Sequence, residues 1–230
     1  MVPGLPGAAD LADAWLVHAL ASLLDACDVP EADRRTLVAS GVDSFRPDTE
    51  ARPDAAASPA RLDACRRALV FAALALEARL NRALRQSDAS GWGAVARLAP
   101  AERFRLTPRL LDELGGEADG AELRGLVAEL FYLRDELVDA GGSPGAALRD
   151  PAAQFTAARA RAMVEASAEA CCLLAPLTGE PEAGTAQLVR RAAAALAPRA
   201  EHPPAESEPG SPRWDYDWGR DEFPPDLIGA

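Results

Sequence analysis

The segment from Glu122 to Gly142 carries the helical period that most constrains the fold of this chain. Its apolar residues recur at alternating steps of three and four. One row consists of Leu123, Leu126, Leu130, Leu133, Leu137 and Ala140, and a second row consists of Val127, Phe131 and Val138. That spacing predicts an amphipathic helix with a wide apolar face. Other helices must cover this face, so the pattern favours a helical bundle.

A positive charge interrupts the second row, because Arg134 stands where an apolar residue is expected. The residues three and four positions away on the same helix are Leu130, Phe131, Leu137 and Val138. None of them is an acid, so we expect no acid on its own helix to pair with Arg134. An unpaired buried charge is costly, so a partner is required. The sequence leaves open another helix, a second subunit or a ligand phosphate.

Composition and charge favour an all-α protein that does not wrap nucleic acid. Hydrophobic residues make up 49% of the chain but aromatic residues only 5%, and alanine is very abundant. The residue types that strands favour are therefore scarce, and no strand alternation or phosphate-binding glycine pattern appears. The net charge of −12 disfavours RNA binding by bulk electrostatics, although a small local site stays open.

No cofactor, metal ion or membrane association is expected from the sequence. Cys27, Cys65, Cys171 and Cys172 lack the spacing of zinc ligands, so we interpret them as buried, reduced thiols. The N-terminus does not have the pattern of a signal peptide, and no segment is apolar enough to span a bilayer. We therefore expect a soluble, cytoplasmic protein.

Caps and breaks divide the chain into three parts. They are an N-terminal helical extension and loop (1–57), a helical bundle (58–197), and a disordered linker with an acidic, aromatic tail (198–230). The bundle is expected to be built on two long antiparallel helices, 58–86 and 122–142, with shorter helices around them. Those shorter helices are predicted at 10–27, 30–41, 100–106, 108–114, 154–177 and 185–196. The helix over 154–177 should pack through a thin apolar stripe of Phe155, Ala162, Ala166, Ala170, Leu173 and Leu177.

The long helix that opens at Ser58 contains an uncharged run from Ala68 to Leu76, which marks it as central. Glu77 follows the run, and Asn81, the sole asparagine of the chain, lies one turn further on. In one interpretation, Glu77 and Asn81 form a polar network that faces Arg134. In the alternative, the helix emerges into solvent at Glu77. Its wet face would then consist of Arg79, Arg82 and Arg85.

The segment LRDELVDAG, residues 133–141, resembles the signature helix of the HEPN superfamily of all-helical proteins. The typical form of that helix is Leu-Arg-Asn-x-Leu-Val-His-Gly. The matching residues are Leu133, Arg134, Asp135, Leu137 and Val138, whereas Asp139 stands at the histidine position. LALEARLN (74–81) is similar to the end of the long first helix of such proteins, and 100–116 to their connecting segment. The resemblance covers roughly residues 59–177.

In HEPN ribonucleases, the resemblance implies, an arginine holds the scissile phosphate and a histidine exchanges protons with the reacting oxygens across a homodimer. An aspartate at position 139 is ionised at neutral pH and donates no proton. We therefore expect Arg134, Asp135 and Asp139 to form a degenerate catalytic set. The protein would act as a homodimer that binds a protein, or RNA weakly, in a regulatory or defence context.

Two alternatives stay open. One is a metal-independent ribonuclease that uses Arg134 with Asp139 or His18. The other is a helical adaptor or scaffold unrelated to the superfamily, in which Arg134 forms only a core ion pair with Glu77.

The C-terminal tail places aromatic residues among acids, at Trp214, Tyr216, Trp218 and Phe223. From Glu201 onward there are eight acids and two arginines, so this segment carries half of the net charge of −12. Aromatic side chains are costly to leave in water, so we expect an ordered contact. The tail is predicted to dock into a basic, hydrophobic groove of a protein partner, or alternatively to fold back over its own domain.

Overall fold

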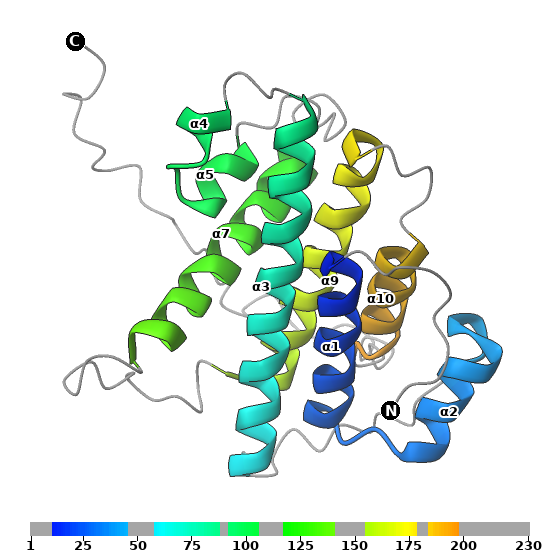
Figure 1. The fold of residues 1–230 in the computed structure, drawn as a ribbon. Helices are drawn as coiled ribbons and strands as arrows, with labels where there is room; N and C mark the ends of the chain where they lie inside the picture. Colours follow the sequence, from blue (N-terminus) through cyan, green and yellow to red (C-terminus); the bar gives the residue numbers. More distant parts are fainter. Residues whose placement is uncertain are drawn as a thin grey trace, which may run out of the picture. The chain divides into compact units, whose positions relative to one another are not determined.

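The computed structural model describes residues 11–45, 58–87, 92–105, 117–140, 155–178 and 184–197, and every element in these ranges is a helix or a helical turn (Figure 1). The predicted all-α fold is therefore confirmed. The elements in chain order are α1 (Leu11–Ala26), α2 (Glu31–Ser40), the 3-10 turn η1 (Val42–Ser44), α3 (Pro59–Ser87), α4 (Trp92–Val95), α5 (Pro100–Arg105), α7 (Glu117–Ala140), α9 (Ala157–Leu174), the 3-10 turn η2 (Ala175–Thr178) and α10 (Gly184–Ala195). The helix predicted at 108–114 and the tail at 198–230 lie outside the described residues.

Local capping explains where several helices begin and end. The hydroxyl of Ser58 accepts the backbone N–H of Arg61 at 3.2 Å at the start of α3. Thr156 caps α9 in the same way, accepting the N–H of Arg159 at 3.2 Å. Each hydroxyl satisfies a backbone donor that has no partner inside its helix. After α2, Gly41 adopts a φ of 75°, a left-handed conformation that glycine tolerates and other residues rarely adopt.

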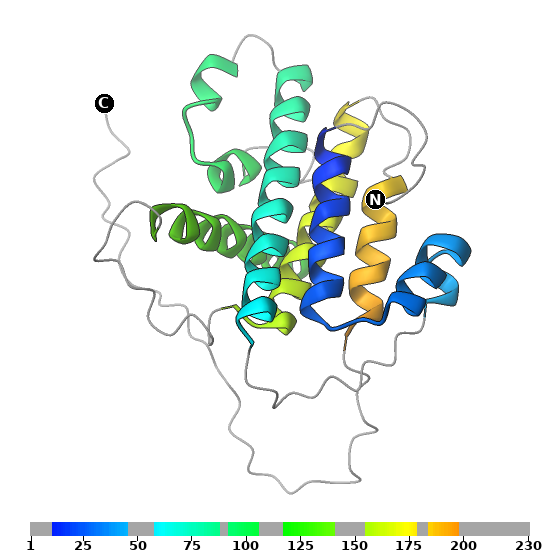
Figure 2. The same ribbon diagram turned by 60° about the horizontal axis from the view of Figure 1, so that its bottom comes forward.

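The core is organised around α3, with α1 packed along it, α9 against another side, and α10 against α9 and α1 (Figures 1 and 2). The uncharged run of α3 lies at the centre of this core, as predicted. Its fully buried residues are Ala68, Leu69, Ala72, Ala73, Ala75 and Leu76. Small side chains let α9 approach closely, so that the hydroxyl of Ser167 donates to the carbonyl of Ala72 at 2.8 Å.

The two longest helices do not form the predicted central antiparallel pair. α7 crosses α3 obliquely in both views and also contacts α5 and α9 (Figures 1 and 2). α1 lies along α3 instead, with Leu16, Leu20 and Leu23 buried in the same core as the apolar run of α3. The first helix is thus an integral part of the bundle rather than an extension of it, because its apolar face covers the side of α3 that α7 leaves free.

The buried stripe of α9 differs from the predicted one. Residues facing the core include Ala160, Met163, Val164, Ser167, Cys171 and Leu174. Of the predicted stripe, Phe155, Ala166 and Ala170 are buried, whereas Ala162, Leu173 and Leu177 are only half-buried. Alanine occupies so many positions of this helix that the sequence offers little contrast between its faces.

Arg79 contradicts the interpretation that placed it on a wet face of α3. Its side chain has no exposed surface, and its Nη2 donates to Asp13 Oδ1 at 2.9 Å. Its Nη1 lies 3.5 Å from the hydroxyl of Thr178, which in turn donates to the carbonyl of Ala175. Arg79 faces α1 and η2 and connects both to α3.

No helix in the described part of the chain has the length and hydropathy needed to cross a bilayer.

Candidate functional site

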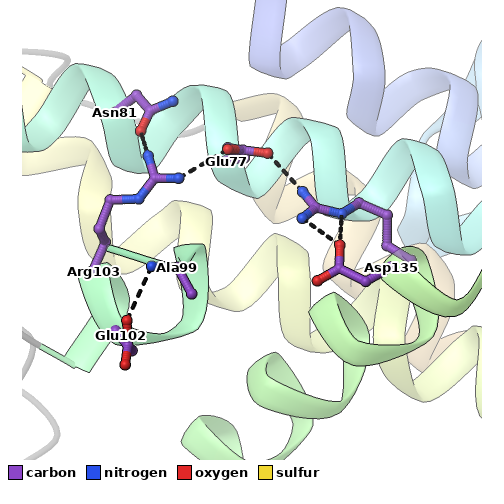
Figure 3. Close-up of polar contacts among 7 residues, drawn as sticks. Glu77, Asn81, Ala99, Glu102, Arg103 and Asp135 are labelled. Atoms are coloured by element: carbon purple, nitrogen blue, oxygen red, sulfur yellow. Dashed lines mark hydrogen bonds and ion pairs between the residues drawn. The ribbon is translucent and has the colours of Figure 1, made fainter. Parts of the chain in front are cut away.

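A polar cluster joins α3, α5 and α7 around the carboxylate of Glu77 (Figure 3). Oε2 of Glu77 accepts from Nη1 of Arg134 at 2.7 Å, and Oε1 accepts from Nη2 of Arg103 at 3.0 Å. The side chain of Glu77 is 27% exposed, while those of Arg134 and Arg103 are 16% and 8% exposed. The structure thus brings Arg134 and Glu77 together as the sequence suggested, with a second guanidinium on the same carboxylate.

Arg103 is the member of the cluster that the sequence did not indicate. Its Nη1 donates to Oδ1 of Asn81, so the guanidinium bridges Glu77 and Asn81 (Figure 3). Asn81 therefore belongs to the polar network as predicted, but it contacts α5 rather than α7. A guanidinium suits this position because its donors diverge in a fixed plane and can bind two acceptors at once.

The short helix α5 holds Arg103 in place. Pro100 begins the helix, and Oε2 of Glu102 accepts the backbone N–H of Ala99 at 3.0 Å, which is half of a capping box (Figure 3). Phe104, beside Arg103, is 2% exposed and anchors the helix to the core. The sequence predicted this helix at 100–106, within one residue of its observed end, but no sequence signal marks Arg103 as buried.

Arg134 also pairs within its own helix, which corrects the expectation that no acid on that helix could reach it. Its Nε and Nη2 donate to Oδ1 of the adjacent Asp135 at 2.9 Å and 2.6 Å. The long side chain bends along the helix surface, so a neighbour at one position becomes reachable. The guanidinium lies 5.1 Å from the ring centroid of Phe131, in a cation–π contact. Val138, expected in the second apolar row, is 65% exposed.

The charges of the cluster balance, since Arg103 and Arg134 face the two carboxylates of Glu77 and Asp135. This balance permits both guanidinium groups to lie near the core without an uncompensated charge. The described side chains of the cluster are arginines, carboxylates and one amide, and none of them is a histidine, the residue that most often serves as a general acid. The cluster is therefore suited to holding helices together, and it contains no evident general acid.

His18 does not supply the missing histidine. It is an exposed residue of α1 whose ring lies 6.0 Å from that of Trp15 and 5.4 Å from that of Phe71. Trp15 and Phe71 stack on each other at 5.4 Å, so His18 completes an aromatic group between α1 and α3. No contact joins His18 to the Glu77 cluster among the described residues.

The remaining predicted site residues are only partly placed. Asp139 falls within α7, but its side chain is not among those described. The predicted partner-binding residues of the tail, Trp214, Tyr216, Trp218 and Phe223, lie outside the described residues. Within the described ranges, no group of three or more histidine, cysteine or acidic side chains could hold a metal ion.

No disulfide joins the four cysteines, of which Cys65 and Cys171 are buried as expected, whereas Cys27 and Cys172 are half-buried. Burial, reinforced by the nearby Cys65 thiol, raises the pKa of Cys27 from 9.0 to about 11. Burial also raises the pKa of Cys65 and of Cys172. These three thiols are therefore protonated at neutral pH and unreactive as nucleophiles.

A shallow surface pocket of about 420 Å³ lies beside Asn81, and Glu77 is not one of its lining residues. Its lining residues are Leu11, Ala78, Asn81, Arg82, Arg85 and Gln86.

Comparison of the chain with protein-family models, curated proteins and solved structures finds no match.

Proposed function

We propose that this protein is a non-catalytic, HEPN-like helical module that acts by binding a protein partner. The observation that carries the proposal is the engagement of Arg134 by two carboxylates, those of Glu77 and Asp135. In ribonucleases of the superfamily, the resemblance implies, this arginine holds the scissile phosphate. Here a phosphate would have to displace both carboxylates, which are already in hydrogen-bond contact with the guanidinium.

The aspartate at position 139 supports the same proposal. A carboxylate ionised at neutral pH donates no proton to a leaving oxygen, so the step assigned to histidine has no donor. The net charge of −12 also disfavours RNA as a partner, because phosphates would be repelled over most approaches. We infer that the module binds a protein in a regulatory or defence setting, and four cysteines without a disulfide support a reducing, cytoplasmic location.

Cleavage of a labelled single-stranded RNA tests the loss of catalysis. We expect wild type and Arg134→Ala to give the same background rate without added metal. Asp139→His is the informative third protein, because it restores the missing proton donor next to an otherwise matching motif. RNA cleavage by wild type that disappears in Arg134→Ala would overturn the proposal.

We further propose that the module is a homodimer in which the α7 helices of two copies meet. Tyr132 and Val138 support this arrangement, because they are 60% and 65% exposed on α7 despite their apolar surface. Tyr132→Arg should then shift the mass in light scattering at tens of micromolar from dimer to monomer. Leu188→Arg, at a 39% exposed apolar residue of α10, serves as the matched control and should leave the dimer intact. A monomer mass for wild type would refute the dimer.

The Arg134–Glu77 ion pair also supports a second candidate, a helical adaptor unrelated to the superfamily in which the pair is purely structural. The two candidates differ in what they require of α7. A HEPN-like dimer places the two α7 helices side by side, whereas an adaptor does not need this. Oxidative cross-linking of Tyr132→Cys, compared with wild type, therefore separates them, since a covalent dimer specific to the variant favours the HEPN-like module.

A further inference from the structure

A groove lies between α7 and α9, and none of its lining residues belongs to the Glu77 cluster. The two helices are joined where Nε of Arg159 donates to Oε1 of Glu129 at 2.6 Å. The groove has a volume of about 400 Å³ and is lined by Glu122, Leu123, Leu126, Arg161, Ala162, Glu165, Ala166 and Glu169. This volume is within the range of pockets that bind ligand or partner side chains.

The groove combines an apolar surface with acidic edges. Leu123 and Ala166 are almost fully buried, and Leu126 and Ala162 are half-buried, so the apolar surface continues from the core to the groove. Nη1 of Arg161 donates to Glu165 Oε2 at 2.6 Å and neutralises that carboxylate. Glu122 and Glu169 have no ion-pair partner among the described residues. Three carboxylates against one guanidinium leave the groove with two negative charges.

We propose that the groove between α7 and α9 docks a basic amphipathic helix of a protein partner. Apolar side chains at helical spacing would contact Leu123 and Leu126, and flanking lysine or arginine side chains would pair with Glu122 and Glu169. Ala162 and Ala166 are the small side chains of the α9 wall, and they leave room for apolar side chains of the docked helix. The proposal rests on the proposed binding function and names the chemistry of the partner.

Charge selects this occupant over other candidates. A nucleic acid or an acidic peptide would bring negative charge to a groove that already carries two uncompensated carboxylates. The pocket beside Asn81 has a similar volume but contains Arg82 and Arg85 in its wall and no acid. A basic helix is therefore complementary to the α7–α9 groove and not to the pocket beside Asn81.

Fluorescence anisotropy with two synthetic peptides tests the proposal on the full-length protein. The first peptide is a labelled amphipathic helix of leucine and lysine, and the second has every lysine replaced by glutamate. We expect the basic peptide to bind in the micromolar range at low salt and the acidic peptide not to bind. In the variant Glu122→Lys/Glu169→Lys, the affinity for the basic peptide should fall by roughly tenfold or more, since two charge pairs are reversed.

The matched control makes the same change in net charge elsewhere. Glu31→Lys/Asp63→Lys alters two exposed acids on α2 and at the start of α3 and should lower the affinity far less. A second groove variant, Ala162→Arg, blocks the apolar surface without removing an acid and should also weaken binding. Circular dichroism melts of each variant establish that it is folded.

Several results would overturn the proposal. They are no binding of the basic peptide at hundreds of micromolar, equal binding of the two peptides, or equal weakening by the groove and control variants. Dissociation of a wild-type dimer by Glu122→Lys/Glu169→Lys would instead identify a second copy as the occupant and would also reject a basic partner helix. None of these outcomes affects RNA cleavage, so the proposed loss of catalysis is tested separately.

Discussion

Truncation of Glu77 is the change that most directly tests the polar cluster. Glu77→Ala removes the only carboxylate that the structure shows between Arg103 and Arg134 in the described part of the chain. Both guanidinium groups then lose an ion pair while staying largely shielded from water. Asn81 still binds Arg103 and Asp135 still binds Arg134, so neither charge is left without any partner.

The expected magnitude follows from how exposed these groups are. Removing one partner of a fully buried ion pair destabilises a protein by about 3–5 kcal/mol, whereas a surface pair contributes about 0–1 kcal/mol. Glu77 is 27% exposed but serves two arginines that are 8% and 16% exposed. We therefore expect Glu77→Ala to lower the free energy of unfolding by about 3 kcal/mol. Arg134→Ala should cost only about 1–2 kcal/mol, because Glu77 keeps Arg103.

Urea denaturation followed by circular dichroism measures these free energies for wild type, each single variant and Glu77→Ala/Arg134→Ala. The double variant should be less destabilised than the sum of the single variants by about 1 kcal/mol, which is the coupling of the pair. Glu129→Ala is the control, since its ion pair with Arg159 has side chains that are 34% and 33% exposed. Its cost should stay near 1 kcal/mol or below.

Additive effects of Glu77→Ala and Arg134→Ala would refute the reasoning, because they would mean that the two side chains do not interact. A cost of Arg134→Ala equal to or above that of Glu77→Ala would refute the claim that Glu77 is shared. Either result would return Arg134 to the residues available for a phosphate.

Three further predictions concern single positions. Arg79→Ala should lower the free energy of unfolding in the urea assay by about 3 kcal/mol, because it removes a fully buried ion-pair partner. Arg35→Ala is the control and should change it by less than about 0.5 kcal/mol, because the side chain of Arg35 is 78% exposed. Gly41→Ala should destabilise the protein by about 1 kcal/mol, because a φ of 75° strains an L-residue. Gly125→Ala, in open space on α7, should stabilise it by about 0.5–1 kcal/mol. Equal effects of the two variants in thermal melts would contradict this prediction. The raised pKa of Cys27 keeps its thiol protonated in the folded state, while the same thiol ionises in the unfolded state. The free energy of unfolding should therefore fall as the pH rises from 9 to 11. Urea titrations across this range should show that Cys27→Ala removes that part of the pH dependence.

The sequence predicted the parts of the fold that depend on strong local contrast. The apolar run of α3 and the single charge in the second row of α7 stood out against their surroundings, so the sequence offered the pairing of Glu77 with Arg134 as one of its alternatives. The carboxylate and the guanidinium were the lone charges of two apolar surfaces, and burial of one requires the other.

Other features depended on contacts that no local pattern encodes. Arg103 lies on a helix of six residues, and only the tertiary placement of α5 brings it to Glu77. Asp135 reaches Arg134 because a long side chain bends, which the spacing rule of three and four positions does not describe. The burial of Arg79 was missed because α3 carries several other arginines from which no local pattern distinguishes it, and the stripe of α9 was misplaced because alanine is abundant around that helix.

The sharing of one carboxylate by α5 and α7 has a consequence for how the molecule opens. A helix of six residues is too short to persist by itself, so α5 stays helical only while Arg103 and Phe104 hold it against the bundle. Loss of the Glu77 contact releases α5 and loosens α7 in the same event. The amide hydrogens of these two helices should therefore exchange with solvent as one cooperative unit, at a lower free energy than those of α1, α3, α9 and α10.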